Sequence, residues 1–378
     1  MSSVINSASF IGSHWRVWTV VGAAPYTQFS WQGLYCIYAI SINLLVTLCF
    51  PLHLGAKLFS NAAIIDDLKN LTNFVATISC SLKIIFYAYN LQQVRHMEQL
   101  LAILDTRIQG SAQRQIYNQM CKQLRSLIII FACVCVLVSA SAELSFVFQA
   151  ERKLLYPGWF PFDWQHSTLK FYAAHVYQIG GISLQIAQNY ASDSFPVVLF
   201  CLTSAHIQML YKRIEQLGVG SELEVETELE ACITDHKHLL ELFATLESLI
   251  SWPVFIQFGA SALNICISIA AMLFFVTEPM ARVSFFFYAL AMPMQIFPTC
   301  YYATDAVLWF GKLHYAAFSC NWLTQQRSFK CKLMLFVERS LRNDPAKAGG
   351  MVGIHVNAIF GTLKLAYSLF TLILRMQK

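Results

Sequence analysis

HVNAIFGTLKLAYSLFTLILRMQK, residues 355–378, ends the chain and decides its fold. About 20 mainly apolar residues can cross a bilayer as one helix, so this stretch predicts a membrane span. At about 100° per residue, its polar residues fall within an arc of roughly 80°. We call this arc the polar stripe: Asn357, Gly361, Lys364, Ser368, Thr371 and Arg375. Polar groups facing lipid are costly, so the stripe faces either another helix or a water-lined path.

The composition of the whole chain indicates a membrane protein with several spans. Apolar residues make up 57% and charged residues 12%, and the mean hydropathy is +0.51. Soluble domains carry about 25% charged residues. The net charge of +5 requires no nucleic-acid partner, because the positive residues fall in loops beside the spans. We expect the spans themselves to contact membrane lipid.

Six further apolar segments precede the C-terminal one, so the sequence predicts an all-α membrane protein with seven transmembrane helices. Lys83 lies inside the second segment and must face protein or reach toward the headgroups. Residues 306–318 predict a separate helix that is too short and too mixed to span. The six segments are residues 34–54, 71–91, 126–148, 176–208, 250–276 and 283–303.

Charge predicts the direction of the spans. Lys and Arg are concentrated in residues 92–125, 212–249 and 305–351. Cytoplasmic loops carry the excess of Lys and Arg, so we expect a cytoplasmic N-terminus and an extracellular C-terminus, with helical anchor segments in the cytoplasm. G-protein-coupled receptors run the other way, and their Asp-Arg-Tyr and Asn-Pro-x-x-Tyr motifs are missing from the third and seventh spans. The chain also lacks the internal duplication of repeat-built transporters.

Signals for an enzyme, a cofactor or a metal are weak. The sequence contains no His-Glu-x-x-His, Gly-x-Ser-x-Gly or Walker motif. Asp235, His236 and His238 are close in sequence, but histidines at i and i+2 point to different helix faces, so a metal site is not expected. The twelve cysteines fall in apolar spans or predicted cytosolic loops and suit buried thiols better than disulfides. We therefore expect no enzyme, no cofactor and no metal.

A series of motifs runs from Pro298 to the C-terminus. It includes a Cys-Tyr-Tyr triplet, an alanine pair before a Cys and a Trp, a basic run, an Ala-Gly-Gly turn and the tail FGTLKLAYSLFTL at 360–372. This series resembles the insect odorant receptor family, and the tail is quite specific for it. One departure is Asp305, where the family commonly has Asn or a similar polar residue. The matched positions are Cys300–Tyr302, residues 316–322, residues 330–335 and residues 348–350.

The resemblance implies a tuned, odorant-binding subunit of a non-selective cation channel that opens on odorant binding. Its partner is the odorant receptor co-receptor, in a heterotetramer at the plasma membrane of olfactory sensory neuron dendrites. Alternatives are a gustatory-type chemoreceptor channel, a G-protein-coupled receptor and a transporter. The implied regions are a six-helix ligand-binding part at 1–303, a cytoplasmic anchor at 304–354 and a pore-lining helix at 355–378.

The resemblance also implies site residues. The pore and its gate fall at Gly361, Leu365, Ser368, Leu372 and Met376, with the hydrophobic constriction at the last two. Asn70 is a weak glycosylation candidate. Within the anchor, Arg327, Lys330 and Lys332 either meet acidic residues or merely obey the charge rule. The odorant pocket falls at Val75, Ser79, Leu82, Ser139, Ala142, Phe146, Ile186, Tyr190, Phe287, Tyr288 and Met292, each of which could instead be an ordinary packing residue.

Overall fold

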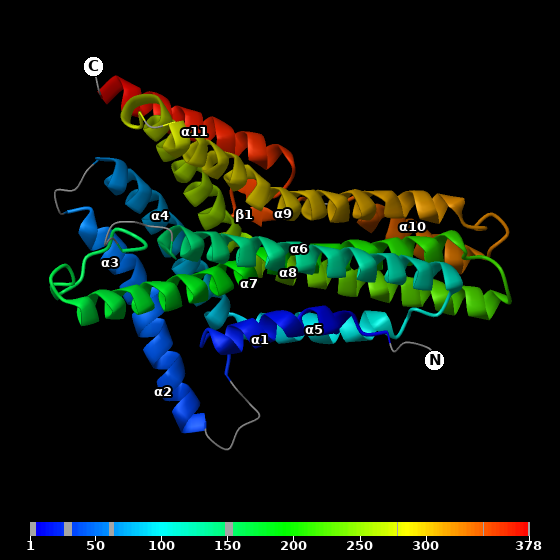
Figure 1. Cartoon of the computed structure of the whole chain (residues 1–378). Coiled ribbons are helices and arrows are strands. Elements are labelled where there is room, and N and C mark those ends of the chain that lie inside the picture. The colour runs from blue at the N-terminus through cyan, green and yellow to red at the C-terminus, as the bar shows by residue number, and fades with distance from the viewer. Residues whose placement is uncertain are drawn as a thin grey trace.

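The computed structural model describes residues 5–25, 32–59, 64–147, 154–277, 279–342 and 344–376. Almost all of them are helical (Figure 1). The first part of the chain forms η1 (Ser7–Phe10), α1 (Gly12–Val20), α2 (Gln32–Ile42), η2 (Asn43–Leu48), α3 (Cys49–Lys57), α4 (Ile64–Tyr89), α5 (Leu91–Asp105) and α6 (Ser111–Val147). The second part forms α7 (Thr168–Glu215), α8 (Glu222–Ala270), η3 (Ala271–Phe275), α9 (Pro279–Ser319), α10 (Arg327–Ser340), β1 (Lys347–Ala348), β2 (Val352–Gly353) and α11 (Asn357–Met376).

Seven helical stretches among the described residues are long and apolar enough to cross a membrane. Each overlaps one of the predicted segments, so the prediction of seven spans is confirmed. The stretches are Gln32–Lys57, Asp67–Tyr89, Ser111–Leu137, Thr168–Glu215, Glu222–Phe275, Arg282–Ser319 and Asn357–Arg375.

Three helices are much longer than a membrane requires. α7, α8 and α9 have 48, 49 and 41 residues and run side by side across Figure 1. A helix of the length of α7 measures about 72 Å, more than twice the hydrocarbon core of about 30 Å. The three helices therefore build both the spanning bundle and a long extension beyond it.

The prediction of a separate short helix at 306–318 is wrong, because α9 continues without a break to Ser319. This part of α9 carries a buried stripe at Ala306, Phe310 and Leu313 that belongs to the main core. Packing against α7 and α10 keeps it helical where its mixed composition predicts an exit from lipid.

The N-terminal segment lies against the extension rather than apart from it. Helix α1 runs beside α5 in Figure 1 and packs on α7. Ile11 and Trp18 are fully buried, and the Ser7 hydroxyl donates to Asp105 Oδ1 at 2.6 Å. The start of the chain thereby becomes part of the core of the extension.

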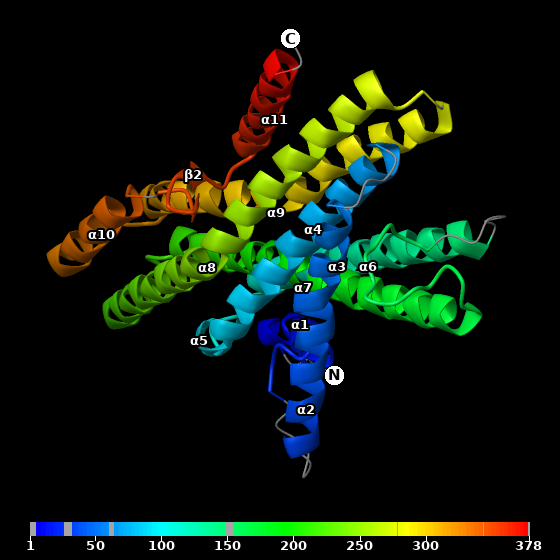
Figure 2. The same ribbon diagram turned by 90° about the vertical axis from the view of Figure 1, so that its left-hand side faces the viewer.

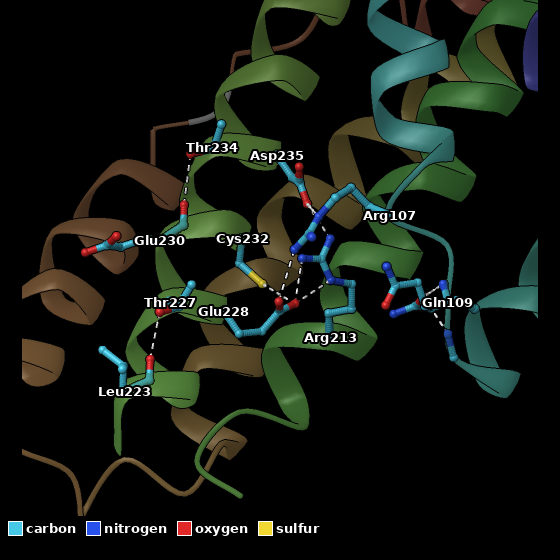
Figure 3. A network of polar contacts seen from close by, with 12 residues as sticks. Arg107, Gln109, Arg213, Leu223, Thr227, Glu228, Glu230, Cys232, Thr234 and Asp235 are labelled. Atoms are coloured by element: carbon cyan, nitrogen blue, oxygen red, sulfur yellow. Dashed lines mark hydrogen bonds and ion pairs between the residues drawn. The ribbon is translucent and has the colours of Figure 1, made fainter. Parts of the chain in front are cut away.

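Two arginines and two acids join the helices of the extension at one point, the charge cluster of Figure 3. Arg107 follows α5, Arg213 lies on α7, and Glu228 and Asp235 lie on α8. Arg107 donates to Glu228 at 3.0 Å and to Asp235 at 3.3 Å, while Arg213 Nε donates to Glu228 at 2.9 Å and its guanidinium also reaches Asp235. Because Asp235 is buried, these bonds compensate for its lost hydration and tie three parts of the chain together.

The acidic face of α8 is only partly solvated. Glu226 and Glu230 both accept hydrogen bonds from Lys332 of α10, and these bonds raise the pKa of Lys332. For the basic residues of the anchor, acidic partners and the charge rule alone were the two alternatives, and Lys332 has acidic partners within its own chain.

Candidate functional site

A groove between α6 and α7 is the best candidate for a ligand site near the predicted pocket. Its volume is about 490 Å³, within the range of about 300–1,000 Å³ typical of small-molecule sites. The walls are mainly apolar, and Ser183 and Tyr190 supply hydroxyl groups. The lining residues are Ala132, Cys135, Val136 and Ala140 of α6 and Ser183, Ile186, Ala187 and Tyr190 of α7.

Tyr190 is held in the groove from behind by the N-terminal helix. The imidazole of His14 stacks on its ring, with centroids 6.3 Å apart and planes at 9°. His14 Nε2 is also 2.9 Å from Ser194 Oγ, and the Ser194 hydroxyl donates to the Tyr190 carbonyl at 2.6 Å. These contacts fix the wall to which both Ile186 and Tyr190 contribute.

On α4, the predicted pocket residues divide between the interior and the outer surface. Ser79 is buried, and its hydroxyl has no hydrogen-bond partner within the described part of the chain. Val75 is half-buried. Leu82 is 48% exposed and points away from the interior.

On α9 the same division occurs. Phe287 is 61% exposed on the outer surface, whereas Tyr288 is half-buried. Met292 packs against Ala262 and Ile265 of α8 and Ala366 of α11. The side chains predicted on α6, those of Ser139, Ala142 and Phe146, lie outside the described residues.

Sequence reasoning missed the α6 wall of the groove, which lies about two turns before Ala142. Ala132, Cys135, Val136 and Ala140 recur at spacings of three, four and eight residues. Small side chains at helical spacing leave room beside a neighbouring helix, and this signal was available in the sequence.

Helix α11 turns its polar stripe away from its own chain. Ala358, Thr362 and Ala366 form its buried face, which packs on α8 and to a lesser extent on α9. In Figure 2, α11 stands at the edge of the bundle beside these two helices. Within the stripe, Asn357, Gly361, Lys364, Ser368 and Arg375 are exposed and Thr371 is half-exposed.

Of the predicted pore and gate residues, Gly361 and Ser368 belong to that stripe, and Leu365 and Leu372 border it. Leu365 and Leu372 are 47% and 56% exposed, so neither fills the interior of the chain. The side chain of Met376 lies outside the described residues. A single chain thus presents polar groups with apolar neighbours on one open face of α11.

Asn70 lies in the interior of the folded chain. It is fully buried on α4, and its Nδ2 donates to the Leu54 carbonyl at 2.8 Å. A glycan would have to occupy that same nitrogen, so the folded structure counts against glycosylation at this position.

The Asp235, His236 and His238 group has structural contacts. Asp235 belongs to the charge cluster, and the ring of His236 packs edge-on against Phe336 at 5.0 Å. Among the described residues, no group of three or more His, Cys, Asp or Glu side chains could hold a metal ion.

Comparisons with known proteins agree with this architecture. A family model described as 7tm Odorant receptor matches residues 63–367. Odorant receptor 59a of Drosophila melanogaster is 52% identical over 99% of both chains, and odorant receptor 33b of the same species is 33% identical over 98% of this chain and 97% of its own. The solved structure of the insect olfactory receptor OR5 from Machilis hrabei in complex with eugenol superposes with a TM-score of 0.83 at 13% identity, covering 97% of this chain and 98% of that one.

Proposed function

Because the chain belongs to the 7tm odorant receptor family, we propose that this receptor subunit forms part of an odorant-gated, non-selective cation channel. As a multi-pass membrane receptor it is not an enzyme. The observation that carries the proposal is the open face of α11, where a stripe with Lys364 and Ser368 is exposed on the single chain. Polar side chains at membrane depth are stable when they face water. If the α11 helices of several subunits surround one central axis, their polar stripes line a water-filled pore.

In the proposed channel, Leu372 and Met376 form the constriction and Gly361, Leu365 and Ser368 line the path below it. The i, i+4 spacing of Leu372 and Met376 puts them on one face beside the polar stripe. A ring of apolar side chains closes a narrow pore by excluding water. The exposure of Leu372 supports this role, since its side chain is not used by the fold of its own chain.

The proposed ligands are small volatile molecules, and the groove between α6 and α7 supports this proposal through its volume and its apolar walls. Ser183 and Tyr190 can each bond one polar group of an odorant. Selectivity then follows from the shape of the walls. The remaining pocket residues predicted on α4, α6 and α9 stay predictions.

We further propose that the chain assembles as a heterotetramer with the odorant receptor co-receptor through the extension. Met334 and Leu335 of α10 are 73% and 66% exposed, and a groove of about 630 Å³ separates α8 from α10. Apolar residues exposed beside such a groove suit a protein partner. The proposed regions 1–303, 304–354 and 355–378 are functional parts of one folded body, since α9 crosses the first boundary.

The proposed orientation puts the N-terminus and the extension in the cytoplasm of an olfactory sensory neuron dendrite and the C-terminus outside. The excess of Lys and Arg in the loops of the extension supports it.

Whole-cell recording tests the proposal. Cells that express this chain with the co-receptor are exposed to an odorant panel while a non-hydrolysable GDP analogue in the pipette blocks G-protein signalling. We expect odorant-evoked cation currents that cells with the co-receptor alone do not give to the same odorants. Currents abolished by the GDP analogue would instead identify a G-protein-coupled receptor.

A further inference from the structure

A buried ion pair, unused by the pocket or the pore, lies inside the bundle. Lys83 of α4 is only 1% exposed, and its ammonium donates to Asp193 Oδ1 at 2.5 Å, Gln257 Oε1 at 2.7 Å and Asn189 Oδ1 at 3.0 Å. An ammonium has three N–H groups, so these three acceptors satisfy it completely.

The cluster continues to a fourth helix. The second carboxylate oxygen of Asp193 accepts a hydrogen bond from Gln295 of α9, and Gln257 Nε2 donates onward to Ser261 Oγ at 3.3 Å. One connected network therefore joins α4, α7, α8 and α9. We call these five residues the lysine cluster: Lys83, Asn189, Asp193, Gln257 and Gln295.

The lysine cluster adjoins the predicted pocket on three helices. Ser79 precedes Lys83 by four residues on α4, and Tyr190 precedes Asp193 by three residues on α7. Met292 precedes Gln295 by three residues on α9. Each pair lies about one helical turn apart on the same side of its helix.

Helix α8 leads from the lysine cluster to α11. Gln257 lies about one to two turns from Ala262 and Ile265 of α8, which pack with Ala366 in the buried face of α11. Within the described residues, Lys83 makes one side-chain hydrogen bond to α8, the one to Gln257. Beside the apolar packing of Met292 on α8 and α11, that bond is the polar link between the buried charge on α4 and the helix that supports the pore.

The cluster itself does not hold an odorant. The cavity beside Lys83, Asp193 and Gln257 measures about 20 Å³, far below the volume of about 300 Å³ at which small-molecule sites begin. Its residues can influence the response only by holding helices in register.

We propose that the lysine cluster is the fixed point through which movements of the pocket helices reach α8 and hence α11. If any of the four helices slid along its neighbours, a hydrogen bond to a buried charge would break. The four helices therefore move together at the position of the lysine cluster. The inference rests on the proposed channel function and deepens it.

The test variant is Gln257→Leu, which removes the bond to α8 and leaves Lys83 with two acceptors, its ion-pair partner Asp193 and Asn189. We expect normal surface expression and a half-maximal concentration that moves about fivefold or more, by the same factor for every odorant. Its matched control is Gln188→Leu. Gln188 is likewise an amide inside the bundle, although it is fully buried and Gln257 is half-buried. It donates at 2.9 Å to Thr47 of η2 and accepts from Cys80 of α4, and neither of these hydrogen bonds goes to α8. Gln188→Leu should leave the half-maximal concentrations at parental values.

Three outcomes would overturn the inference. Parental responses from Gln257→Leu at normal surface expression would remove the coupling role, and a changed odorant ranking would assign Gln257 to the pocket. If Gln257→Leu fails to reach the surface, Gln295→Leu at the other end of the cluster decides by the same readout, and loss of both proteins from the surface would assign the cluster to folding alone. Parental receptors that give no current at all would refute the channel proposal instead.

Discussion

Tyr190 contributes both a ring and a hydroxyl to the groove, and the structure holds it there by stacking on His14. Few other polar groups line the walls. In the proposed binding of a volatile molecule at this site, recognition therefore depends on the volume and outline of single side chains.

Replacing Tyr190 by Ala should enlarge the groove and change the order of odorant preference. A methylene in an apolar site is worth about 1–3 kcal/mol, so loss of the ring should shift the half-maximal concentration of at least one odorant by about tenfold. Concentration–response curves for a panel on the co-expressed pair measure this. Tyr172→Ala is the control, because Tyr172 is exposed on the same helix and outside the groove. An unchanged ranking in the Tyr190 variant would remove this wall from the pocket.

Replacing Leu372 by Ser should raise the current without odorant. A hydroxyl wets the proposed constriction and weakens its closure. Leak current and ion permeability of the co-expressed channel are the readouts. Leu363→Ser is the control, since Leu363 lies on the opposite side of α11 from Leu372. If leak, permeation and dose response all stay parental in the Leu372 variant, the residue does not belong to the gate.

Among the elements, α7, α8 and α9 depend on polar contacts as well as apolar packing. In the charge cluster, Asp235 bonds the two arginines that come from different parts of the chain. Removing Asp235 leaves both arginines with Glu228 as their acidic partner in the charge cluster. Because Arg213 is largely buried, the loss of one carboxylate there is more harmful than loss of a surface pair.

Asp235→Ala should therefore destabilise the extension by about 1–3 kcal/mol, because it removes hydrogen bonds to two arginines while Glu228 continues to pair them. Retention of detergent-solubilised complex after heating, followed by size-exclusion chromatography, reports the loss. Glu230→Ala removes an exposed acid from the same helix and should change stability by less than about 1 kcal/mol. Equal thermal stability of the two variants would contradict the role of the charge cluster.

Hydropathy located all seven spans because burial in lipid leaves a strong local signal. It did not predict that α9 continues to Ser319. That part of α9 is stabilised because its residues Ala306 and Phe310 pack against segments that are distant in the sequence. The sequence likewise left Lys83 to face protein or to reach toward the headgroups, and it could not identify the partners on α7 and α8, which lie more than a hundred residues away. Of the residues that line the groove, the sequence analysis named Ile186 and Tyr190 of α7. Which residues of α6 face them depends on the relative axial position of the two helices, and a single sequence does not specify that position.

At the scale of the whole molecule, the described part of a single chain leaves the polar stripe of α11 and the apolar residues Met334 and Leu335 of α10 uncovered. Both are explained if further subunits surround them. An isolated chain would expose charged side chains to lipid along α11, which is unfavourable.

Expression without the co-receptor should accordingly give little surface protein and no odorant current. Surface biotinylation and whole-cell recording, with and without the co-receptor, measure the two effects. Robust odorant-evoked current from this chain alone would refute the obligate partnership.

The most direct test of the central claim asks whether the polar stripe of α11 faces water in the assembled channel. Ser368 lies in the middle of the stripe, and Tyr367 is 67% exposed on a different face of the same helix. Ser368→Cys and Tyr367→Cys are co-expressed with the co-receptor and treated with a charged methanethiosulfonate reagent, beside the parental chain as a control for native cysteines. We expect lasting block of the odorant current only in Ser368→Cys, faster while odorant is present; equal insensitivity of Ser368→Cys and the parental chain would contradict a pore lined by this helix.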